Sequence, residues 1–362
     1  MNLLLFLLGL AALVAGASLL VRGASKLALS FGISPLVVGL TIVAFGTSAP
    51  EVAVSVGAVL DGKADLAIGN VVGSNIFNVL FILGVSALIA PLAVNVQLSR
   101  QEVPIMIGAS LLLLVLGMDR TLGFGDAVLL FALLIGYSVF LVRQSRRQTS
   151  QAQAEYAEDF RPAQTGAWDS TVPAQIALIV VGLVLLVYGS EWLVTASVNF
   201  AKAMGVGDLV IGLTIVAAGT SMPEVATSIA AALKGERDIA VGNVIGSNTF
   251  NILGCLGISG LVSRDGLSIA PAVLNFDLWV MVAVAVACLP VFIVGREIGR
   301  RKGLLFVGYY VAYVAYLILG AQDHDALDEY SAIMIGFVLP ITIVTLMAML
   351  IRNQTRQGGS SG

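Results

Sequence analysis

Long apolar runs, separated by short polar breaks, extend along almost the whole chain. Most runs hold about 18 or more residues, enough for a helix to cross the ~30 Å hydrocarbon core of a bilayer. Reading the runs between the breaks predicts eleven helices, near residues 3–29, 36–60, 66–90, 103–118, 124–142, 173–200, 209–233, 239–262, 276–295, 303–320 and 331–351. A buried helix of a soluble protein could account for one such run but not for a series. The pattern therefore predicts an all-α polytopic membrane protein with about 10–11 transmembrane helices.

Composition agrees with this pattern and excludes several functions. Hydrophobic residues make up 58% of the 362 residues and charged residues only 11%, whereas about a quarter of a soluble domain is charged. The chain has no G-x-x-x-x-G-K-[ST] loop, so nothing indicates that ATP hydrolysis drives it. No basic block indicates nucleic acid as a partner. A single histidine, His324, excludes a multi-histidine metal site, and no cofactor is expected.

The basic residues predict the orientation of the helices. If the N-terminus lies outside, all but four of the 19 Lys and Arg residues fall at cytoplasmic positions; the exceptions are Lys63, Arg120, Lys202 and Arg264. This bias is the one that the positive-inside rule requires. We therefore expect the N-terminus outside and the C-terminus in the cytoplasm.

A long polar stretch predicts how the chain is divided. Residues 144–172 have no apolar periodicity and are interpreted as a cytoplasmic linker, with a regulatory segment as the alternative. Five predicted helices precede this linker, in residues 1–143, and five follow it, in residues 173–320. Residues 321–352 are expected to add one more transmembrane helix, and residues 353–362 a short tail.

The two groups of helices share an internal repeat. Residues 39–78 align with residues 212–251 without a gap, each residue matching the one 173 positions later, and about two-thirds of the positions are identical. Duplication is the only reasonable origin of such a match. Because each copy contains five helices, an odd number, the second copy must be inverted in the membrane. Inverted repeats of this kind place a transport site near the midplane, often on discontinuous or kinked helices.

Each repeat carries a glutamate deep inside an apolar helix, Glu51 in the first and Glu224 in the second. A carboxylate at this depth costs several kcal/mol unless it faces a cavity or a cation. A protonated glutamate that merely packs is the alternative. The segment Gly-Thr-Ser-x-Pro precedes both glutamates, and its proline frees the backbone carbonyl four residues earlier. Carboxylate, hydroxyl and carbonyl oxygens are the ligands that Na+ and Ca2+ prefer.

A second polar motif, G-N-x-x-G-S-N-x-F-N, follows in both repeats. Ser74 and Asn78 lie four residues apart, as do Ser247 and Asn251, so each pair lies on one face of a helix. The glycines of the motif form G-x-x-x-G patterns that allow close helix packing. Asn75 and Asn248 lie off this face, and we expect them to form hydrogen bonds between helices.

The paired GTSxPE and GNxxGSNxFN segments resemble the α-repeats of the calcium/cation antiporter superfamily, particularly bacterial calcium/sodium antiporters. The resemblance implies an antiporter in a prokaryotic inner (plasma) membrane that transports Ca2+ and Na+. It implies that Glu51 and Glu224 clamp Ca2+ from opposite sides and that Thr47 and Thr220 contribute oxygens. It also implies that the neighbouring Na+ sites are lined by Ser48, Ser74, Asn78, Ser221, Ser247, Asn251 and the carbonyls of Ala44 and Ala217.

Some sodium/calcium exchangers have an aspartate in place of one of the late asparagines, whereas this chain has Asn78 and Asn251. Two glutamates and two asparagines also resemble the proton/calcium exchangers, so coupling to H+ stays open. From other classes, a cation channel could use the same oxygens, although an inverted pair suits alternating access better. An intramembrane enzyme would need a catalytic pair that the motifs do not offer, so no enzymatic activity is expected.

Overall fold

The structure, a computed structural model, describes residues 2–147, 168–204, 217–263, 265–322 and separate stretches between 324 and 347. In this part of the chain, eight helices or continuous helix series are long and apolar enough to span a membrane, and a bent pair adds a ninth. The predicted fold class, an all-α polytopic membrane protein, is confirmed. Most of the predicted linker, the start of the predicted helix 209–233, about half of the predicted helix 331–351 and the tail lie outside the described residues.

The first repeat runs from α1 to α8. Its helices are α1 (Asn2–Phe31), α2 (Pro35–Val38), α3 (Ala44–Thr47), α4 (Ala49–Leu60), α5 (Ala64–Phe77), α6 (Leu83–Ile89), α7 (Val103–Leu116) and α8 (Phe124–Arg147). Three π-helical segments join or extend these helices: Gly39–Val43, Asn78–Ile82 and Leu98–Glu102. Each predicted span of this repeat is therefore present, and three of them are built from several helical segments.

The second repeat follows the same plan. Its helices are α10 (Val172–Ala203), α12 (Ala217–Gly219), α13 (Met222–Leu233), α14 (Arg237–Phe250), α15 (Leu256–Val262), α16 (Leu278–Ile293) and α17 (Arg300–Ala321). Its π-helical segments are Asn251–Cys255 and Val273–Asp277. Beyond the repeat lie α18 (Ala326–Ile333) and a π-helical segment, Met334–Val338.

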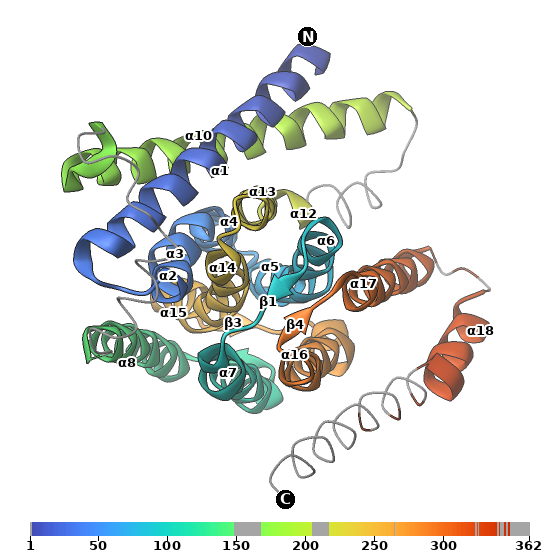
Figure 1. The fold of residues 1–362 in the computed structure, drawn as a ribbon. Helices are drawn as coiled ribbons and strands as arrows, with labels where there is room; N and C mark the ends of the chain where they lie inside the picture. Colours follow the sequence, from blue (N-terminus) through green and yellow to red (C-terminus); the bar gives the residue numbers. More distant parts are fainter. Residues whose placement is uncertain are drawn as a thin grey trace, which may run out of the picture.

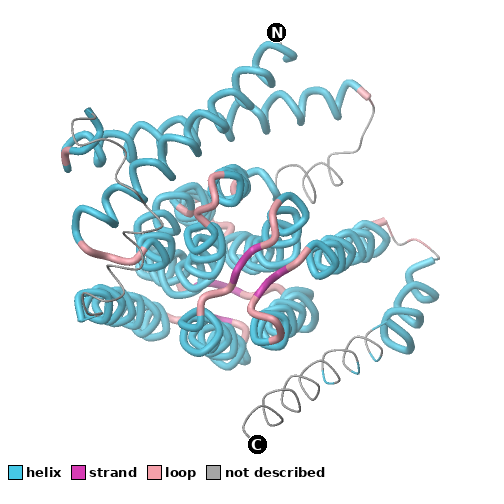
Figure 2. The backbone as a smooth tube through the Cα atoms, viewed as in Figure 1, coloured by secondary structure: helices cyan, strands magenta, loops and turns pink. Residues whose placement is uncertain are grey.

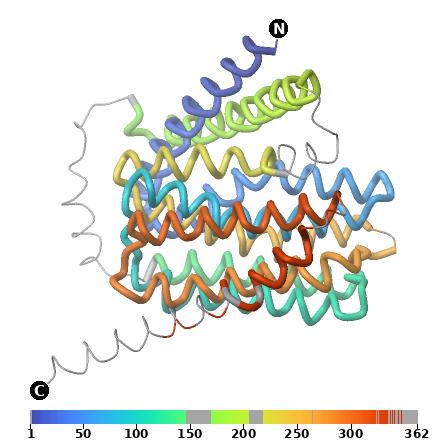
Figure 3. The backbone as a smooth tube through the Cα atoms, turned by 90° about the vertical axis from the view of Figure 1, so that its right-hand side faces the viewer, coloured from blue at the N-terminus to red at the C-terminus, as the bar shows by residue number. Residues whose placement is uncertain are grey.

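Helices α1 and α10 pack together along their length and cross the other helices obliquely (Figures 1 and 3). Glycines mark the contact. A Cβ added at Gly16 would lie 2.7 Å from the carbonyl oxygen of Gly182, and one at Gly9 would lie 2.8 Å from that of Gly189. Only glycine allows the two backbones to approach this closely. The pair is therefore held by backbone contact, which larger side chains would prevent.

Two short antiparallel strand pairs join the repeats (Figure 2). Strand β1 (Leu92–Ala93) pairs with β4 (Glu297–Ile298). Strand β2 (Thr121–Leu122) pairs with β3 (Leu267–Ser268). In each pair one strand comes from the first repeat and one from the second. The two halves thus share backbone hydrogen bonds in their loops as well as side-chain packing in the core.

The helix that carries each glutamate is broken, as predicted. Helix α3 ends before Ser48 (φ −83°, ψ 7°), α13 begins after Ser221 (φ −86°, ψ 7°), and the first break bends the chain by 42°. Pro50 and Pro223 occupy the second positions of the new helices, where a missing N–H costs nothing. The proline leaves the Gly219 carbonyl without its helical donor, and the Ser190 hydroxyl supplies one at 2.6 Å.

Candidate cation-binding site

Glu51 and Glu224 lie in the first turns of α4 and α13 and are completely buried. A helix N-terminus favours a carboxylate, because its backbone dipole and free N–H groups point toward the first turn. The hydroxyl of Ser221 lies 2.9 Å from Oε1 of Glu51, and that of Ser48 lies 2.8 Å from Oε1 of Glu224. Each glutamate therefore receives a hydrogen bond from the helix break of the opposite repeat.

The two serines of the second motif lie beside these pairs. The Ser247 hydroxyl donates to Oε1 of Glu224 at 3.5 Å, and the hydroxyl oxygens of Ser74 and Ser221 are 3.2 Å apart. All four serines are buried. The structure thus brings the predicted glutamates and serines together in one cluster where the repeats meet.

Asn78 and Asn251 are also buried, and each begins a π-helical segment. Nδ2 of Asn78 donates to Oδ1 of Asn248 at 3.0 Å, and Nδ2 of Asn251 donates to Oδ1 of Asn75 at 3.1 Å. Single π-helical turns widen a helix and recur at functional sites. These turns follow the Ser-Asn face of each repeat, and nothing in the sequence pattern had indicated them.

Several buried oxygens of the cluster have no hydrogen-bond donor among the described residues. They are Oε2 of Glu51, Oε2 of Glu224, Oδ1 of Asn78, Oδ1 of Asn251 and Oγ1 of Thr220. Leaving buried acceptors unpaired is costly, and most such groups in folded proteins are paired. Four of the five occur as matched pairs from the two repeats. These oxygens fit the donor set of a hard cation.

The remaining predicted residues differ between the repeats. Thr47 donates to Oδ1 of Asn243 at 3.1 Å, whereas its counterpart Thr220 has the unpaired hydroxyl described above. The carbonyl of Ala44 accepts the backbone N–H of Ser48 at 3.0 Å. Ala217 is the first residue of α12. The hydrogen bond from Thr47 to an asparagine thus has no counterpart at Thr220 among the described residues.

Comparison with known proteins identifies the family. The sodium/calcium exchanger protein family matches residues 1–143 and 174–319 of the chain. The chain belongs to this family. Its match leaves out the predicted linker and stops before α18.

Relatives and solved structures of sodium/calcium exchangers agree. The putative antiporter CaxA of Alkalimonas amylolytica is 38% identical and covers 87% of this chain and 98% of its own length. The sodium/calcium exchanger MaX1 of Methanosarcina acetivorans is 36% identical, and the match covers 87% of this chain and 98% of MaX1. The structure of the sodium-calcium exchanger NCX_Mj superposes on this one with a TM-score of 0.73 at 31% identity. The superposition covers 87% of this chain and 97% of NCX_Mj. The chain is thus an integral membrane protein of the calcium/cation antiporter superfamily.

Two asparagines near the site of this family member were not among the predicted residues. Asn70 donates to the Ser55 hydroxyl at 3.0 Å, and Asn243 donates to the Ser228 hydroxyl at 3.1 Å. Each bond links the helix of the second motif to the helix that carries the glutamate. Asn70 and Asn243 are identical in the two repeats, so the repeat alignment already contained the signal. Their hydrogen bonds indicate that they fix the spacing of these helices.

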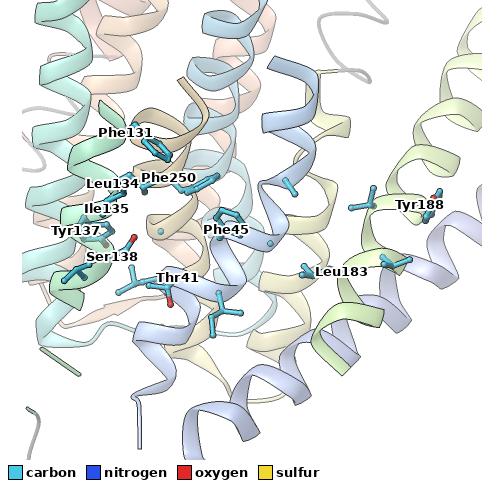
Figure 4. Close-up of a pocket in the computed structure, with 18 residues that line it drawn as sticks. Thr41, Phe45, Phe131, Leu134, Ile135, Tyr137, Ser138, Leu183, Tyr188 and Phe250 are labelled. Atoms are coloured by element: carbon cyan, nitrogen blue, oxygen red, sulfur yellow. The ribbon is translucent and has the colours of Figure 1, made fainter. Parts of the chain in front are cut away.

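A cavity of about 840 Å3 lies beside the cluster and contains none of the predicted ion ligands (Figure 4). Its lining comes mainly from α8, α10 and the segment before Thr47, and is almost entirely apolar. Phe45 and Phe250 meet edge to face at its wall, with ring centroids 5.0 Å apart. Its few hydroxyl groups are a poor ligand set for a cation, whereas the buried polar cluster holds the carboxylate and amide oxygens that a hard cation prefers.

Proposed function

We propose that this chain exchanges Ca2+ for Na+ across the membrane by alternating access. The observation that carries the proposal is the pair of fully buried glutamates, one from each inverted repeat, each with one carboxylate oxygen that no described donor satisfies. A hard cation between Glu51 and Glu224 would offset the cost of burying both charges. Two carboxylates carry the charge that neutralises one Ca2+.

The proposed ligands follow the two polar motifs. Glu51 and Glu224 bind Ca2+, with oxygens from Thr47 and Thr220. The Na+ ions use the same glutamates together with Ser48, Ser74, Asn78, Ser221, Ser247, Asn251 and the Ala44 and Ala217 carbonyls. Because the glutamates are shared, Na+ and Ca2+ exclude each other, and each binding event weakens the other reciprocally.

The serine contacts suggest how binding is coupled to movement. Ser48 and Ser221 lie at the helix breaks and donate to the glutamates of the opposite repeat. When the ligands of one glutamate change, the hydrogen bond to the serine at the helix break of the other repeat therefore changes as well. Since the repeats are inverted, one rocking motion can expose the shared site to either side. We also propose the orientation predicted from the basic residues, with the N-terminus outside in a prokaryotic inner membrane.

The names of the relatives support sodium as the partner ion. MaX1 and NCX_Mj are both called sodium/calcium exchangers, and family members at 27% identity over about half of this chain are called sodium/potassium/calcium exchangers. The second candidate is exchange of Ca2+ for H+. It is favoured by the uncharged Asn78 and Asn251, which leave only two carboxylates to balance several Na+ ions.

Uptake of radiolabelled Ca2+ into liposomes distinguishes these functions. Purified protein is reconstituted, and uptake is driven separately by an outward Na+ gradient and by a pH gradient of equal driving force. We expect uptake with the Na+ gradient and none with the pH gradient alone. Uptake driven by the pH gradient would establish the proton-coupled function instead. Uptake that needs no counter-ion would indicate a channel.

A further inference from the structure

Asn75 and Asn248 form a reciprocal contact between the repeats. Nδ2 of Asn75 donates to the backbone carbonyl of Asn248 at 3.2 Å, and Nδ2 of Asn248 donates to that of Asn75 at 3.1 Å. Both side chains are 2% exposed. Turning either amide over would place its oxygen against a carbonyl oxygen. The contact therefore fixes which end of each amide faces away from it.

The fixed ends are the Oδ1 atoms, and each accepts a hydrogen bond from a predicted ion ligand. Oδ1 of Asn248 accepts from Asn78, and Oδ1 of Asn75 accepts from Asn251. Asn78 and Asn251 must then use their NH2 groups in these bonds, which leaves their Oδ1 atoms pointing elsewhere. Those two oxygens are the ones without a donor among the described residues. The four amides are thus linked by hydrogen bonds that fix which end of each amide donates and which accepts.

The bonds also cross between the repeats. Asn75 belongs to the first repeat and orients Asn251 of the second, whereas Asn248 orients Asn78 of the first. A contact that served packing alone would need only the reciprocal bonds to the backbone. The additional bonds impose a chemical requirement, because an oxygen acceptor at Asn75 or Asn248 needs a donor opposite it. An ionised carboxylate at position 78 or 251 cannot supply one.

We propose that Asn75 and Asn248 are positioning residues that turn the side-chain oxygens of Asn251 and Asn78 toward the transported ions and keep both positions uncharged. The inference rests on the proposed function and deepens it. It assigns the two late asparagines to Na+ binding through orientation imposed from the opposite repeat. It also restricts the charge of the site to Glu51 and Glu224.

Replacing Asn75 or Asn248 by leucine, which has nearly the same size, tests the inference. Calorimetric titration of Ca2+ into purified full-length protein is repeated at rising Na+ concentration. In Asn75→Leu and Asn248→Leu we expect the Na+ concentration that half-displaces Ca2+ to rise roughly three- to tenfold, the equivalent of about one lost hydrogen bond. Ca2+ affinity without Na+ should change less than about twofold, because both glutamates remain.

A matched control separates positioning from packing. Thr249 is buried in α14 between Asn248 and Asn251, and its hydroxyl donates to the Ile245 carbonyl of its own helix at 3.1 Å. Its counterpart in the first repeat is the apolar Ile76, so Thr249→Val should fold and leave both ion affinities unchanged. Partial unfolding of any variant would lower the number of binding sites but would not change the Na+ concentration that half-displaces Ca2+.

A double-mutant cycle tests whether Asn75 acts through Asn251. Asn75→Leu should have no further effect on Na+ displacement in an Asn251→Ala background and should keep its full effect in an Asn78→Ala background. If Asn75→Leu does not fold, Asn75→Ser is used, because serine is too short to reach both partners. If Na+ competes with Ca2+ in the unmodified protein but these variants leave the competition unchanged, the positioning role is overturned. If Na+ does not compete with Ca2+ in the unmodified protein, the proposed function itself fails.

Discussion

At the scale of single residues, the buried glutamates show how a costly group is retained. An ionisable side chain at the bilayer centre costs several kcal/mol. Each glutamate recovers part of this through a helix N-terminus and a serine hydroxyl, but one oxygen of each carboxylate has no donor among the described residues. The proposed cation would supply the missing partner of both oxygens. A packing role alone would leave this symmetric deficit unexplained.

Replacing either glutamate by glutamine tests this interpretation. Glu51→Gln and Glu224→Gln should each reduce Na+-driven Ca2+ uptake to background, because one neutral amide removes half of the charge that balances Ca2+. Both variants should remain folded, since glutamine has the size of glutamate and can accept the same serine hydrogen bond. Glu191→Gln, on an exposed position of α10, is the matched control and should transport normally. Normal uptake by either buried variant would contradict the two-carboxylate clamp.

The late asparagines lead to a second prediction at this scale. In Asn251→Asp, the new carboxyl group faces Oδ1 of Asn75 and keeps that contact only while it carries a proton. The pH dependence of Ca2+ transport by this variant should therefore differ from that of the unmodified protein near neutrality, and Asn78→Asp should behave alike. Uptake measured between about pH 6 and 8, a range centred on neutrality, checks this. Two active variants whose pH profiles overlay that of the unmodified protein would show that the amides do not face the ions.

At the scale of helices, glycine decides how closely two elements meet. Helices α1 and α10 touch through Gly9, Gly16, Gly182 and Gly189, where an added Cβ would overlap with the backbone of the other helix. In a membrane such contacts replace the hydrophobic effect, which does not distinguish helix from lipid. The pair should consequently be sensitive to the smallest increase in side-chain size.

Gly16→Ala should destabilise the protein by about 1–3 kcal/mol, as overpacking does, although alanine is the better helix former. Its Cβ would lie 2.7 Å from the Gly182 carbonyl oxygen, so the helices must separate. Thermal unfolding in detergent measures the effect. Gly136→Ala in α8 is the control, because an added Cβ there meets no atom within 4 Å in the described part of the chain. Equal melting temperatures for the two variants would mean that the close contact carries no stability.

At the scale of the whole molecule, ion pairs join the segment before α10 to the first helix. Asp169, in a turn ahead of α10, forms an ion pair with Arg22 of α1 at 2.6 Å and another with Lys26. Gln175 adds a hydrogen bond to the Ser30 hydroxyl at 2.9 Å. The start of the second repeat is thus anchored on the end of α1.

The charge of Asp169 makes this anchor dependent on pH. The ammonium group of Lys26 and, after it, the guanidinium of Arg22 hold the pKa of Asp169 below its usual range, against the opposing effect of burial. Because the pKa is lowered in the folded state, the stabilisation is present above the unfolded pKa of about 3.9 and is lost as the pH falls through the lower folded value. Asp169→Asn should therefore melt earlier than the unmodified protein at pH 7, and the difference should shrink below about pH 4. A constant difference across this range would contradict the ion-pair explanation.

Much of this molecule is determined by the sequence alone. Lipid requires long apolar helices, so the spans can be found from hydropathy. The constant offset between the copies indicates a repeat, and the odd number of spans in each copy predicts that the second is inverted. The prolines and glycines beside them locate the helix breaks. Orientation in the membrane remains a prediction from the basic residues.

The tertiary structure decided the contacts between the repeats. Ser48 and Glu224 are 176 positions apart, and Ser221 and Glu51 are 170 apart, so no local pattern shows that the serines serve the opposite glutamates. The same holds for the direction of the Asn75 and Asn248 amides and for the Ser190 hydroxyl on the Gly219 carbonyl. The repeat makes the two halves alike in sequence, but Thr47 and Thr220 still differ in their hydrogen bonds. Such contacts depend on how the packed helices approach one another, because a hydrogen bond forms or fails over a few tenths of an ångström.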